Sequence, residues 1–378
     1  MGTRKELTAA VKQEALRLGF SLVGVTTADP PRHMDFYRRW TAQGYHGSMA
    51  WMATERALDR RADPQKILPG CQTILVLGAD YPFLEHSNSG GKIAAYAGNL
   101  DYHDVLGERL KQLAAFLASR IDRPLSHRWY TDTGPILERE LAVRAGLGWI
   151  GKNTTLIHPR KGSYFFLAEM FLDLELEVDD PFSGELCGSC TRCLEACPTG
   201  CIEEPYLLNA SRCISYLTIE YRELLPEELR PLMGEWVFGC DVCQQVCPWN
   251  QRFGRGRKIL NEFQPREDVL APNLQEELTL TQQEFRNKFK GSPIKRTKRR
   301  GYLRNAAVAL GNRKAEGAVP ALATALEDEE ALIRAHAAWA LGRIGGEKAR
   351  TALQRRLNLE RDAEVNQEII TALGEINC

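Results

Sequence analysis

Eight cysteines between residues 187 and 247 constrain this chain more than any other feature of its sequence. Four of them form a C-x2-C-x2-C-x3-C-P run: Cys187, Cys190, Cys193 and Cys197, followed by Pro198. This is the spacing with which bacterial ferredoxins hold iron–sulfur clusters. The other four are a lone upstream cysteine and a C-x2-C-x3-C-P run: Cys213, Cys240, Cys243 and Cys247. Eight thiolates are enough ligands for two 4Fe–4S clusters.

The spacing also predicts which cysteines share a cluster. In motifs of this kind the closely spaced cysteines bind one cluster, and the cysteine before the proline binds the other. We therefore assign one cluster to Cys187, Cys190, Cys193 and Cys247, and the other to Cys197, Cys213, Cys240 and Cys243. Structural zinc favours separated C-x2-C pairs, and disulfides are typical of secreted chains, so both alternatives fit less well. Cys201 exceeds the ligand count, and we interpret it as a small buried residue.

Length, charge and apolar content limit the number of domains and the location of the protein. The chain has 378 residues, which allows about two or three domains. Lys plus Arg and Asp plus Glu both number 49, so the formal net charge is zero. No stretch approaches the ~20 apolar residues that span a bilayer, and the N-terminus lacks the apolar segment of a signal peptide. We therefore expect a cytoplasmic protein without a membrane partner, in a compartment where thiols stay reduced. We also expect a monomer.

The first half of the chain alternates between two kinds of pattern. Residues 3–18 have helical apolar spacing, with Thr3 and Glu6 placed for a capping box. Residues 21–25 and 73–78 are short apolar runs typical of buried strands, and residues 102–121 again have helical spacing. Strands separated by helices predict an α/β domain with a mixed sheet over residues 1–180. A ferredoxin-like domain with two clusters is expected over residues 181–255.

The C-terminal part contains an internal repeat. Ala309-Leu-Gly, Ala340-Leu-Gly and Ala372-Leu-Gly recur at intervals of 31 and 32 residues, and each ends an apolar helical pattern. Such periodicity indicates a helical solenoid of the HEAT type. We therefore predict an all-α domain of HEAT-like repeats over residues 256–378, preceded by a basic linker.

That linker is strongly cationic. Residues 285–315 contain eleven Lys and Arg and no Asp or Glu, in a chain whose net charge is zero. A solvated loop would also tolerate such a composition, but clustered cations next to a solenoid favour a site for a nucleic-acid backbone. The candidate contacts are Lys295, Arg296, Lys298, Arg299, Arg300 and Arg304.

Asp132 is the candidate acid of the α/β domain. It stands where a predicted strand, residues 128–131, meets a predicted helix, with Pro135 at the first helical position and Gly146 as the C-terminal glycine. Side chains at such junctions can point into a crevice, where a carboxyl group can act as a general acid. A helix-capping role for Asp132 is the alternative.

Several motifs together resemble one known family. They are the segment from Asp132 to Arg139, the segment from Gly148 to Asn153, Gly162-Ser-Tyr164, the two cysteine runs and the segment from Arg212 to Thr218. In this combination the chain resembles epoxyqueuosine reductase over nearly its whole length. The resemblance implies the last step of queuosine synthesis, in which the epoxide of epoxyqueuosine at the wobble position of tRNA is reduced to an alkene. It also implies cobalamin, two 4Fe–4S clusters, an external electron donor, binding of the tRNA anticodon arm, and a domain plan related to reductive dehalogenases.

The resemblance also suggests roles for individual residues. Asp132 matches the proton donor that is proposed for the family. Six residues fall in segments that surround cobalamin in the family: Arg61, Lys152, Asn153, Ser163, Tyr164 and Ser215.

Two other functions are compatible with parts of the sequence. A ferredoxin-like electron carrier that docks a protein partner would explain the cysteines and the repeats, but it would leave the α/β domain and the basic linker without a role. A cobalamin-dependent reductive dehalogenase of small molecules would leave the basic linker unexplained. Salt-sensitive binding of tRNA would separate the reductase from both alternatives.

Overall fold

The computed structural model of the chain describes residues 3–85 and 90–377, which form two compact units. The first unit comprises Met1–Phe83, Leu100–Ser211 and Val242–Gln264, and the second comprises Leu84–Asn99, Arg212–Asp241 and Pro265–Cys378. Our division into residues 1–180, 181–255 and 256–378 follows sequence motifs, and it stays a prediction.

A four-stranded sheet in the order β1-β2-β7-β4 forms the centre of the first unit. Its strands are β1 (Leu22–Thr27), β2 (Thr73–Asp80), β7 (Phe165–Leu172) and β4 (His127–Tyr130). The expected α/β character is confirmed. All three pairings within this sheet are antiparallel, whereas we expected strand directions to be mixed. The difference arises because a short apolar run predicts a buried strand without indicating its direction.

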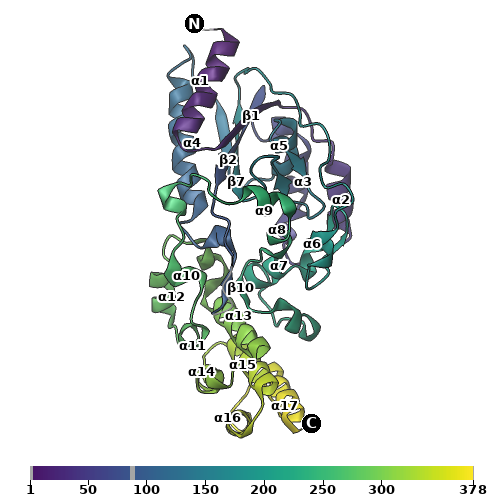
Figure 1. The fold of residues 1–378 in the computed structure, drawn as a ribbon, viewed down its shortest axis with the longest axis vertical. Helices are drawn as coiled ribbons and strands as arrows, with labels where there is room; N and C mark the ends of the chain where they lie inside the picture. Colours follow the sequence, from purple (N-terminus) through teal and green to yellow (C-terminus); the bar gives the residue numbers. More distant parts are fainter. Residues whose placement is uncertain (1–2, 86–89, 378) are drawn as a thin grey trace. The chain divides into compact units, whose positions relative to one another are not determined.

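Helices pack on both faces of this sheet. Helices α1 (Arg4–Arg17) and α4 (Tyr102–Ala118) lie on one side, and α5 (Glu138–Arg144) lies on the other (Figure 1). Ile74 and Val76 of β2 join the apolar cluster beneath α5. Because side chains alternate along a strand, Leu75 of β2 points toward the opposite face, and all three side chains are fully buried. The predicted capping box at the start of α1 is present.

The rest of the first unit consists of short elements that carry loops. These are α2 (Met34–Ala42), α3 (Glu55–Ala62), β5 (Trp149–Ile150), β6 (Leu156–Ile157), α6 (Arg192–Glu195), β8 (Ile202–Glu204), β9 (Leu207–Leu208), α8 (Val242–Gln245) and α9 (Pro248–Phe253). β5 pairs with β6, and β8 pairs with β9. Three of the eight clustered cysteines lie within or directly beside these helices: Cys193 in α6, Cys243 in α8 and Cys247 directly before α9.

The second unit is mainly helical. A short parallel pair of strands, β3 (Lys92–Ile93) and β10 (Trp236–Phe238), adjoins α7 (Ile214–Ile219). Three short helices precede the repeats: α10 (Glu267–Leu270), α11 (Leu274–Glu277) and α12 (Gln282–Lys288). The repeats themselves are α13 (Lys298–Arg313), α14 (Val319–Ala325), α15 (Ala331–Ile344), α16 (Glu347–Leu357) and α17 (Ala363–Asn377).

The repeat helices stack as the sequence predicted. Helices α13, α15 and α17 pack side by side, and α14 and α16 form a second row (Figure 1). Two of the three repeated glycines lie where adjacent helices approach closely: a Cβ atom on Gly311 would lie 2.9 Å from Cα of Ala340, and one on Gly342 would lie 2.8 Å from Cα and Cβ of Ala372. The HEAT-like architecture is therefore confirmed, and its sequence period reflects a helix–helix contact. None of the helices in the described ranges is both long enough and apolar enough to cross a membrane.

Candidate active site and cluster cavity

Asp132 lies in a tight turn opposite the start of α4. Its Oδ2 accepts a hydrogen bond of 2.6 Å from the hydroxyl of Tyr102, and Nε2 of His103 lies 4.0 Å from the same oxygen. His103 is oriented by Asp101, whose Oδ1 lies 2.7 Å from Nδ1 of the imidazole. The Asp132 backbone N–H donates to Oε1 of Glu138 at 2.8 Å. The Asp132 side chain is 66% exposed, so a substrate can reach the carboxyl group.

The local fold corrects two expectations about this turn. Helix α5 begins at Glu138 with Leu137 at its N-cap, rather than at Pro135. Asp132 is therefore not a helix cap, and the capping alternative is wrong. Asp132 has a φ of 58°, a left-handed conformation, and residues 133–137 that follow it are not helical. The predicted C-terminal glycine is confirmed, since Gly146 has a φ of 76° and follows α5.

Two further carboxyl groups lie beside Asp132, and the sequence interpretation missed both. Burial and the charge on Asp132 raise the pKa of Glu138 to about 8. Burial, together with the charges on Glu138 and Asp132, raises the pKa of Glu169 well above its usual range. A signal for Glu169 was present in the sequence, because it is the one charged residue in the apolar strand Phe165–Leu172.

Two of the predicted cofactor-binding residues hold the cysteine-bearing loops. Nζ of Lys152 donates hydrogen bonds to the carbonyl oxygens of Gly188 at 2.6 Å and Cys190 at 3.1 Å. The Asn153 side chain is almost fully buried, and its Nδ2 donates to the carbonyl oxygen of Cys243 at 3.5 Å. Both residues therefore connect the β5–β6 hairpin to loops that carry cysteines.

Ser163 and Arg61 are also held by protein groups. The Ser163 hydroxyl donates to Oε1 of Gln244 in α8 at 2.8 Å, and its backbone N–H donates to Oδ1 of Asn250 at 2.6 Å. The Arg61 guanidinium lies 4.9 Å from the ring centroid of Tyr37, and burial lowers the pKa of Arg61. Contacts of these residues with cobalamin stay predictions.

Tyr164 and Ser215 differ from the rest of the predicted set. Tyr164 is 0% exposed, and its ring packs edge-on against Tyr81 and Phe83 with centroids 5.4 and 5.0 Å away. That burial leaves no surface for a cofactor, so the prediction for Tyr164 is wrong. Ser215 lies in α7 of the second unit and is half-buried. Its role stays a prediction.

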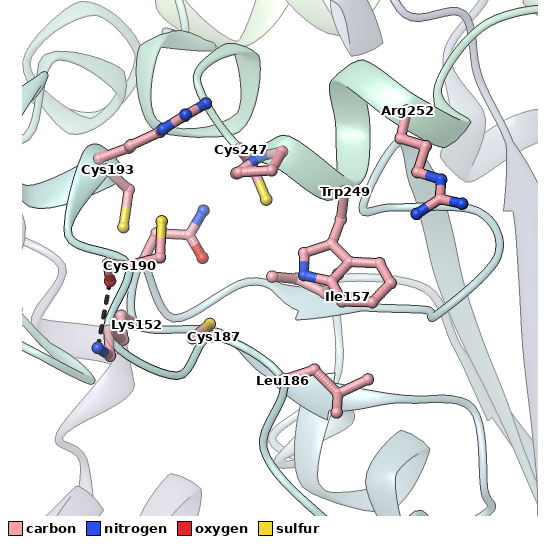
Figure 2. A pocket seen from close by; sticks show the side chains of 12 residues that line it. Lys152, Ile157, Leu186, Cys187, Cys190, Cys193, Cys247, Trp249 and Arg252 are labelled. Carbon is pink, nitrogen blue, oxygen red and sulfur yellow. Dashed lines mark hydrogen bonds between the residues drawn. The ribbon is translucent and has the colours of Figure 1, made fainter.

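The first predicted ligand set surrounds one cavity. Cys187, Cys190, Cys193 and Cys247 line a space of about 290 Å³, and Figure 2 shows their sulfur atoms arranged around it. In the described part of the chain, no three His, Cys, Asp or Glu side chains converge closely enough to bind a single metal ion. The four thiols enclose a volume instead, which is the arrangement that a cluster of several iron atoms requires.

The walls of this cavity suit a buried cluster. Trp149, Ile157 and Trp249 form an apolar group that includes Cys247, and the indole N–H of Trp149 lies 3.5 Å from Sγ of Cys187. Burial raises the pKa of Cys193 to about 11. A thiol in such surroundings becomes a thiolate only with nearby positive charge, which bound iron supplies. These residues therefore fit an iron–sulfur cluster.

The second predicted set is divided between the two units. In the first unit, Cys197 follows α6 and Cys243 lies in α8, and these two helices pack together. Sγ of Cys197 lies 3.4 Å from Sγ of Cys201, which is buried as predicted. The hydrogen bond from Cys201 lowers the pKa of Cys197 to about 5.

In the second unit the two remaining cysteines lie at the ends of neighbouring elements. Cys213 is the N-cap of α7, and Cys240 comes two residues after the end of β10. Helix α7 packs against β10, and the N–H of Gly239 donates to the Thr218 hydroxyl at 2.9 Å. This bond fixes the chain directly before Cys240 against α7.

The basic segment contains both surface and interior cations. Lys295, Arg296 and Lys298 are exposed, and Arg300 is partly exposed. Arg296 pairs with Glu220, with 2.8 Å between Nε and Oε1. The exposed residues thus remain candidates for contacts with phosphate groups.

The predictions for Arg299 and Arg304 are wrong. Arg304 is 0% exposed and donates to the carbonyl oxygens of Leu217 at 2.6 Å and Tyr221 at 2.8 Å. Arg299 is 9% exposed and forms a paired contact with the carboxylate of Asp328. Both side chains stabilise the second unit, because their guanidinium groups satisfy carbonyl and carboxylate oxygens that burial would otherwise leave unpaired.

Comparison with known proteins agrees with this organisation. Residues 61–133 match a family described as epoxyqueuosine reductase QueG, DUF1730. Residues 186–250, which include all eight clustered cysteines, match a 4Fe–4S double cluster binding domain, and residues 299–374 match HEAT repeats. The epoxyqueuosine reductase of Pseudomonas aeruginosa is 40% identical over 350 residues, which cover 90% of this chain and 95% of that protein.

The chain belongs to the epoxyqueuosine reductase family. It is accordingly an oxidoreductase, and its cysteine-rich segment is a double 4Fe–4S cluster domain. A solved epoxyqueuosine reductase in complex with an epoxyqueuosine-modified tRNA stem loop is 33% identical, with a TM-score of 0.92 and complete coverage of both chains. The epoxyqueuosine reductase of Bacillus subtilis, also 33% identical, has a TM-score of 0.90 over 99% of this chain and 100% of that one. It was solved with its aspartate catalytic loop swung out of the active site.

Proposed function

We propose that this chain reduces epoxyqueuosine at the wobble position of a tRNA to queuosine, with Asp132 as the proton donor. The observation that carries the proposal is the match over the full length of the chain to a reductase solved with epoxyqueuosine-modified tRNA. The exposed carboxyl group of Asp132, next to Tyr102 and His103, supports the assignment of the acid.

The net reaction defines what the residues have to do. Removing the epoxide oxygen as water and forming the alkene consumes two electrons and two protons. When bound, the two clusters and cobalamin would supply these electrons from an external donor. The four-thiol cavity fits the first cluster, whereas the second ligand set is supported by its sequence spacing. Cobalamin is proposed from the family resemblance.

Asp132 would transfer its proton to the oxygen that leaves the epoxide carbon. The Tyr102 hydroxyl orients the carboxyl group through Oδ2, and His103 is close enough to restore the proton through a small movement. Proton transfer from a positioned carboxyl group typically contributes about 10²–10⁴-fold to rate. Asp132→Asn should therefore lower kcat by roughly that factor while leaving the cluster content unchanged.

The experiment is an anaerobic turnover assay. Reconstituted and chemically reduced protein is given tRNA carrying epoxyqueuosine, with and without cobalamin, and the nucleosides are analysed by mass spectrometry. Loss of one oxygen only in the presence of cobalamin is the expected result. If the clusters are intact and no conversion occurs, the reductase proposal is wrong, and the chain is better explained as an electron carrier.

Binding of the tRNA is proposed to use the exposed cations of the basic segment. Lys295→Gln combined with Lys298→Gln should reduce the dependence of log affinity on log salt by about 1–2, because each lost phosphate contact removes about one unit of slope. Lys5→Gln, which removes an exposed charge from α1, serves as the control. Equal salt dependence of the double variant and the control would refute this site.

A further inference from the structure

The turn that carries Asp132 (residues 131–137, the Asp132 turn) is anchored by a carboxyl group that the proposed chemistry does not use. Asp132 has a left-handed backbone conformation, which is uncommon for a residue with a side chain. Its N–H donates to Oε1 of Glu138 at 2.8 Å, and Glu138 is the first residue of α5. Tyr102 holds the side chain of Asp132, whereas Glu138 holds its backbone. The two contacts therefore act on different parts of the same residue.

Glu138 in turn lies near an acid in the interior of the sheet. Glu169 of β7 is 0% exposed, and neither of its carboxyl oxygens has a hydrogen-bond partner in the described part of the chain. It is in register with Val76 of β2 and Tyr130 of β4, which both contribute to the apolar cluster beneath α5. Residues directly opposite in antiparallel strands point to the same face, so Glu169 points toward α5.

The charges around Glu138 determine when it ionises. Burial and the charge on Asp132 raise its pKa to about 8, while the Asp132 N–H and the cations of Arg139 and Arg61 act in the opposite direction. Glu169, the remaining neighbour, is protonated, because burial raises its pKa well above the usual range. Glu138 is therefore mostly neutral at pH 7, and its carbonyl oxygen accepts the Asp132 N–H without adding a negative charge.

We infer that Glu138 is a positioning residue: its carboxyl group keeps the Asp132 turn closed, with the Asp132 carboxyl group beside Tyr102. The inference rests on the proposed role of Asp132 as proton donor. A related enzyme was solved with its aspartate catalytic loop swung out of the active site. If the Asp132 turn can open in the same way, a contact that stabilises its closed form would keep the proton donor in the active site. When Glu138 ionises at high pH, it repels the carboxylate of Asp132 and favours the open turn.

Three variants test the inference. Glu138→Ala removes the acceptor, whereas Glu138→Gln keeps an acceptor oxygen and removes the ionisation. Glu140→Gln is the matched control, since Glu140 is a buried acid on the same helix that accepts the backbone N–H groups of Arg32 and His33 instead. Each protein is measured by kcat and KM for epoxyqueuosine tRNA from pH 6 to about 9, and by amide hydrogen exchange of residues 131–137.

Glu138→Ala should lower kcat about tenfold, equivalent to about 1.4 kcal/mol, with KM nearly unchanged. Its Asp132 turn should exchange amide hydrogens faster. Glu138→Gln should keep kcat within about threefold of the native value and keep the exchange protection, and it should lose the decline in activity above pH 8. Glu140→Gln should match the native protein in all three measurements.

Equal loss of kcat in the Ala and Gln variants, with unchanged exchange, would refute positioning by Glu138. The same exchange increase in Glu140→Gln would show a general effect on α5 and would also refute it. The exchange measurement needs no turnover. Suppose that the native protein fails to convert epoxyqueuosine, while Glu138→Ala still exchanges the amide hydrogens of the Asp132 turn faster than Glu138→Gln does. In that case the proposed function is wrong, but the stabilisation of the turn by Glu138 is supported.

Discussion

The repeat glycines offer the sharpest test of how the second unit is held together. Replacing Gly342 by Ala adds a Cβ atom that would lie 2.8 Å from both Cα and Cβ of Ala372. The same replacement at Gly374 meets nothing within 4 Å, although both glycines end the same Ala-Leu-Gly motif. The two sites therefore share sequence context and differ in packing.

Two opposing effects determine the magnitude. Glycine is less favourable than alanine inside a helix by about 0.8–1 kcal/mol, so each replacement gains up to that amount. At Gly342 the new methyl group overlaps a backbone atom of α17, and overpacking of this kind costs about 1–3 kcal/mol. Gly342→Ala should therefore lose up to about 2 kcal/mol, while Gly374→Ala, near the helix end, should gain about 0.5 kcal/mol.

Urea unfolding followed by circular dichroism measures the difference. With a slope of about 2 kcal/mol per molar urea, the midpoints of the two variants should lie up to about 1 M apart, with Gly374→Ala the more stable. Gly311→Ala tests a second close contact, because its Cβ would lie 2.9 Å from Cα of Ala340. Its unfolding midpoint should shift in the same direction as that of Gly342→Ala. If Gly342→Ala and Gly374→Ala shift the midpoint equally, the close helix approach is not what fixes the repeat period.

Three further predictions concern buried charges. The folded protein keeps a proton on Glu138 between about pH 4.5 and 8, and the unfolded chain does not. The free energy of unfolding should therefore fall as the pH rises through this window, by up to ~1.4 kcal/mol per pH unit from this group. Glu138→Gln should reduce the decline in thermal melts but not abolish it, because Glu169 also keeps its proton in the folded protein. Glu368→Gln should cost about 3–5 kcal/mol in urea unfolding, because the guanidinium of Arg230, 3% exposed, pairs with both carboxylate oxygens; a loss below about 1 kcal/mol would contradict this. Arg304→Met should lower the melting temperature but leave the salt dependence of tRNA binding unchanged at temperatures below melting, and a changed slope would restore Arg304 to the tRNA site.

The parts of the site that the sequence predicted are those fixed by local spacing. Cys187, Cys190 and Cys193 lie within seven residues of one another, so their sequence separation nearly determines that they face one cavity. Cys247 comes from far along the chain, but the proline motif that follows it carries the same geometric information. The repeat period behaves similarly, because each motif meets an equivalent motif in the next repeat.

The predictions that failed depended on packing between distant segments. Arg299 and Arg304 look like surface cations, since their neighbours in the sequence are cations too. Arg304 is interior because it comes within reach of the carbonyl oxygens that follow α7, more than 80 residues earlier in the chain. Composition predicts a charged segment correctly but does not indicate which of its cations have a buried partner, so accessibility requires the three-dimensional structure.

The two acids beside Asp132 differ in how far the sequence could predict them. A charged residue inside an eight-residue apolar strand is expected to be buried, as Glu169 is. A buried carboxyl group without a neighbouring cation keeps its proton. The neutral state of Glu169 could therefore have been predicted from the sequence of β7. The position of Glu138 could not be predicted in the same way, because it depends on where α5 begins, and Pro135 predicts an earlier start than Glu138. Because α5 begins at Glu138, the carboxyl group of this residue can accept the Asp132 N–H at 2.8 Å. Loss of this acceptor in Glu138→Ala should therefore be seen as faster amide exchange in the Asp132 turn, whereas Glu138→Gln, which keeps an acceptor oxygen, should preserve its protection.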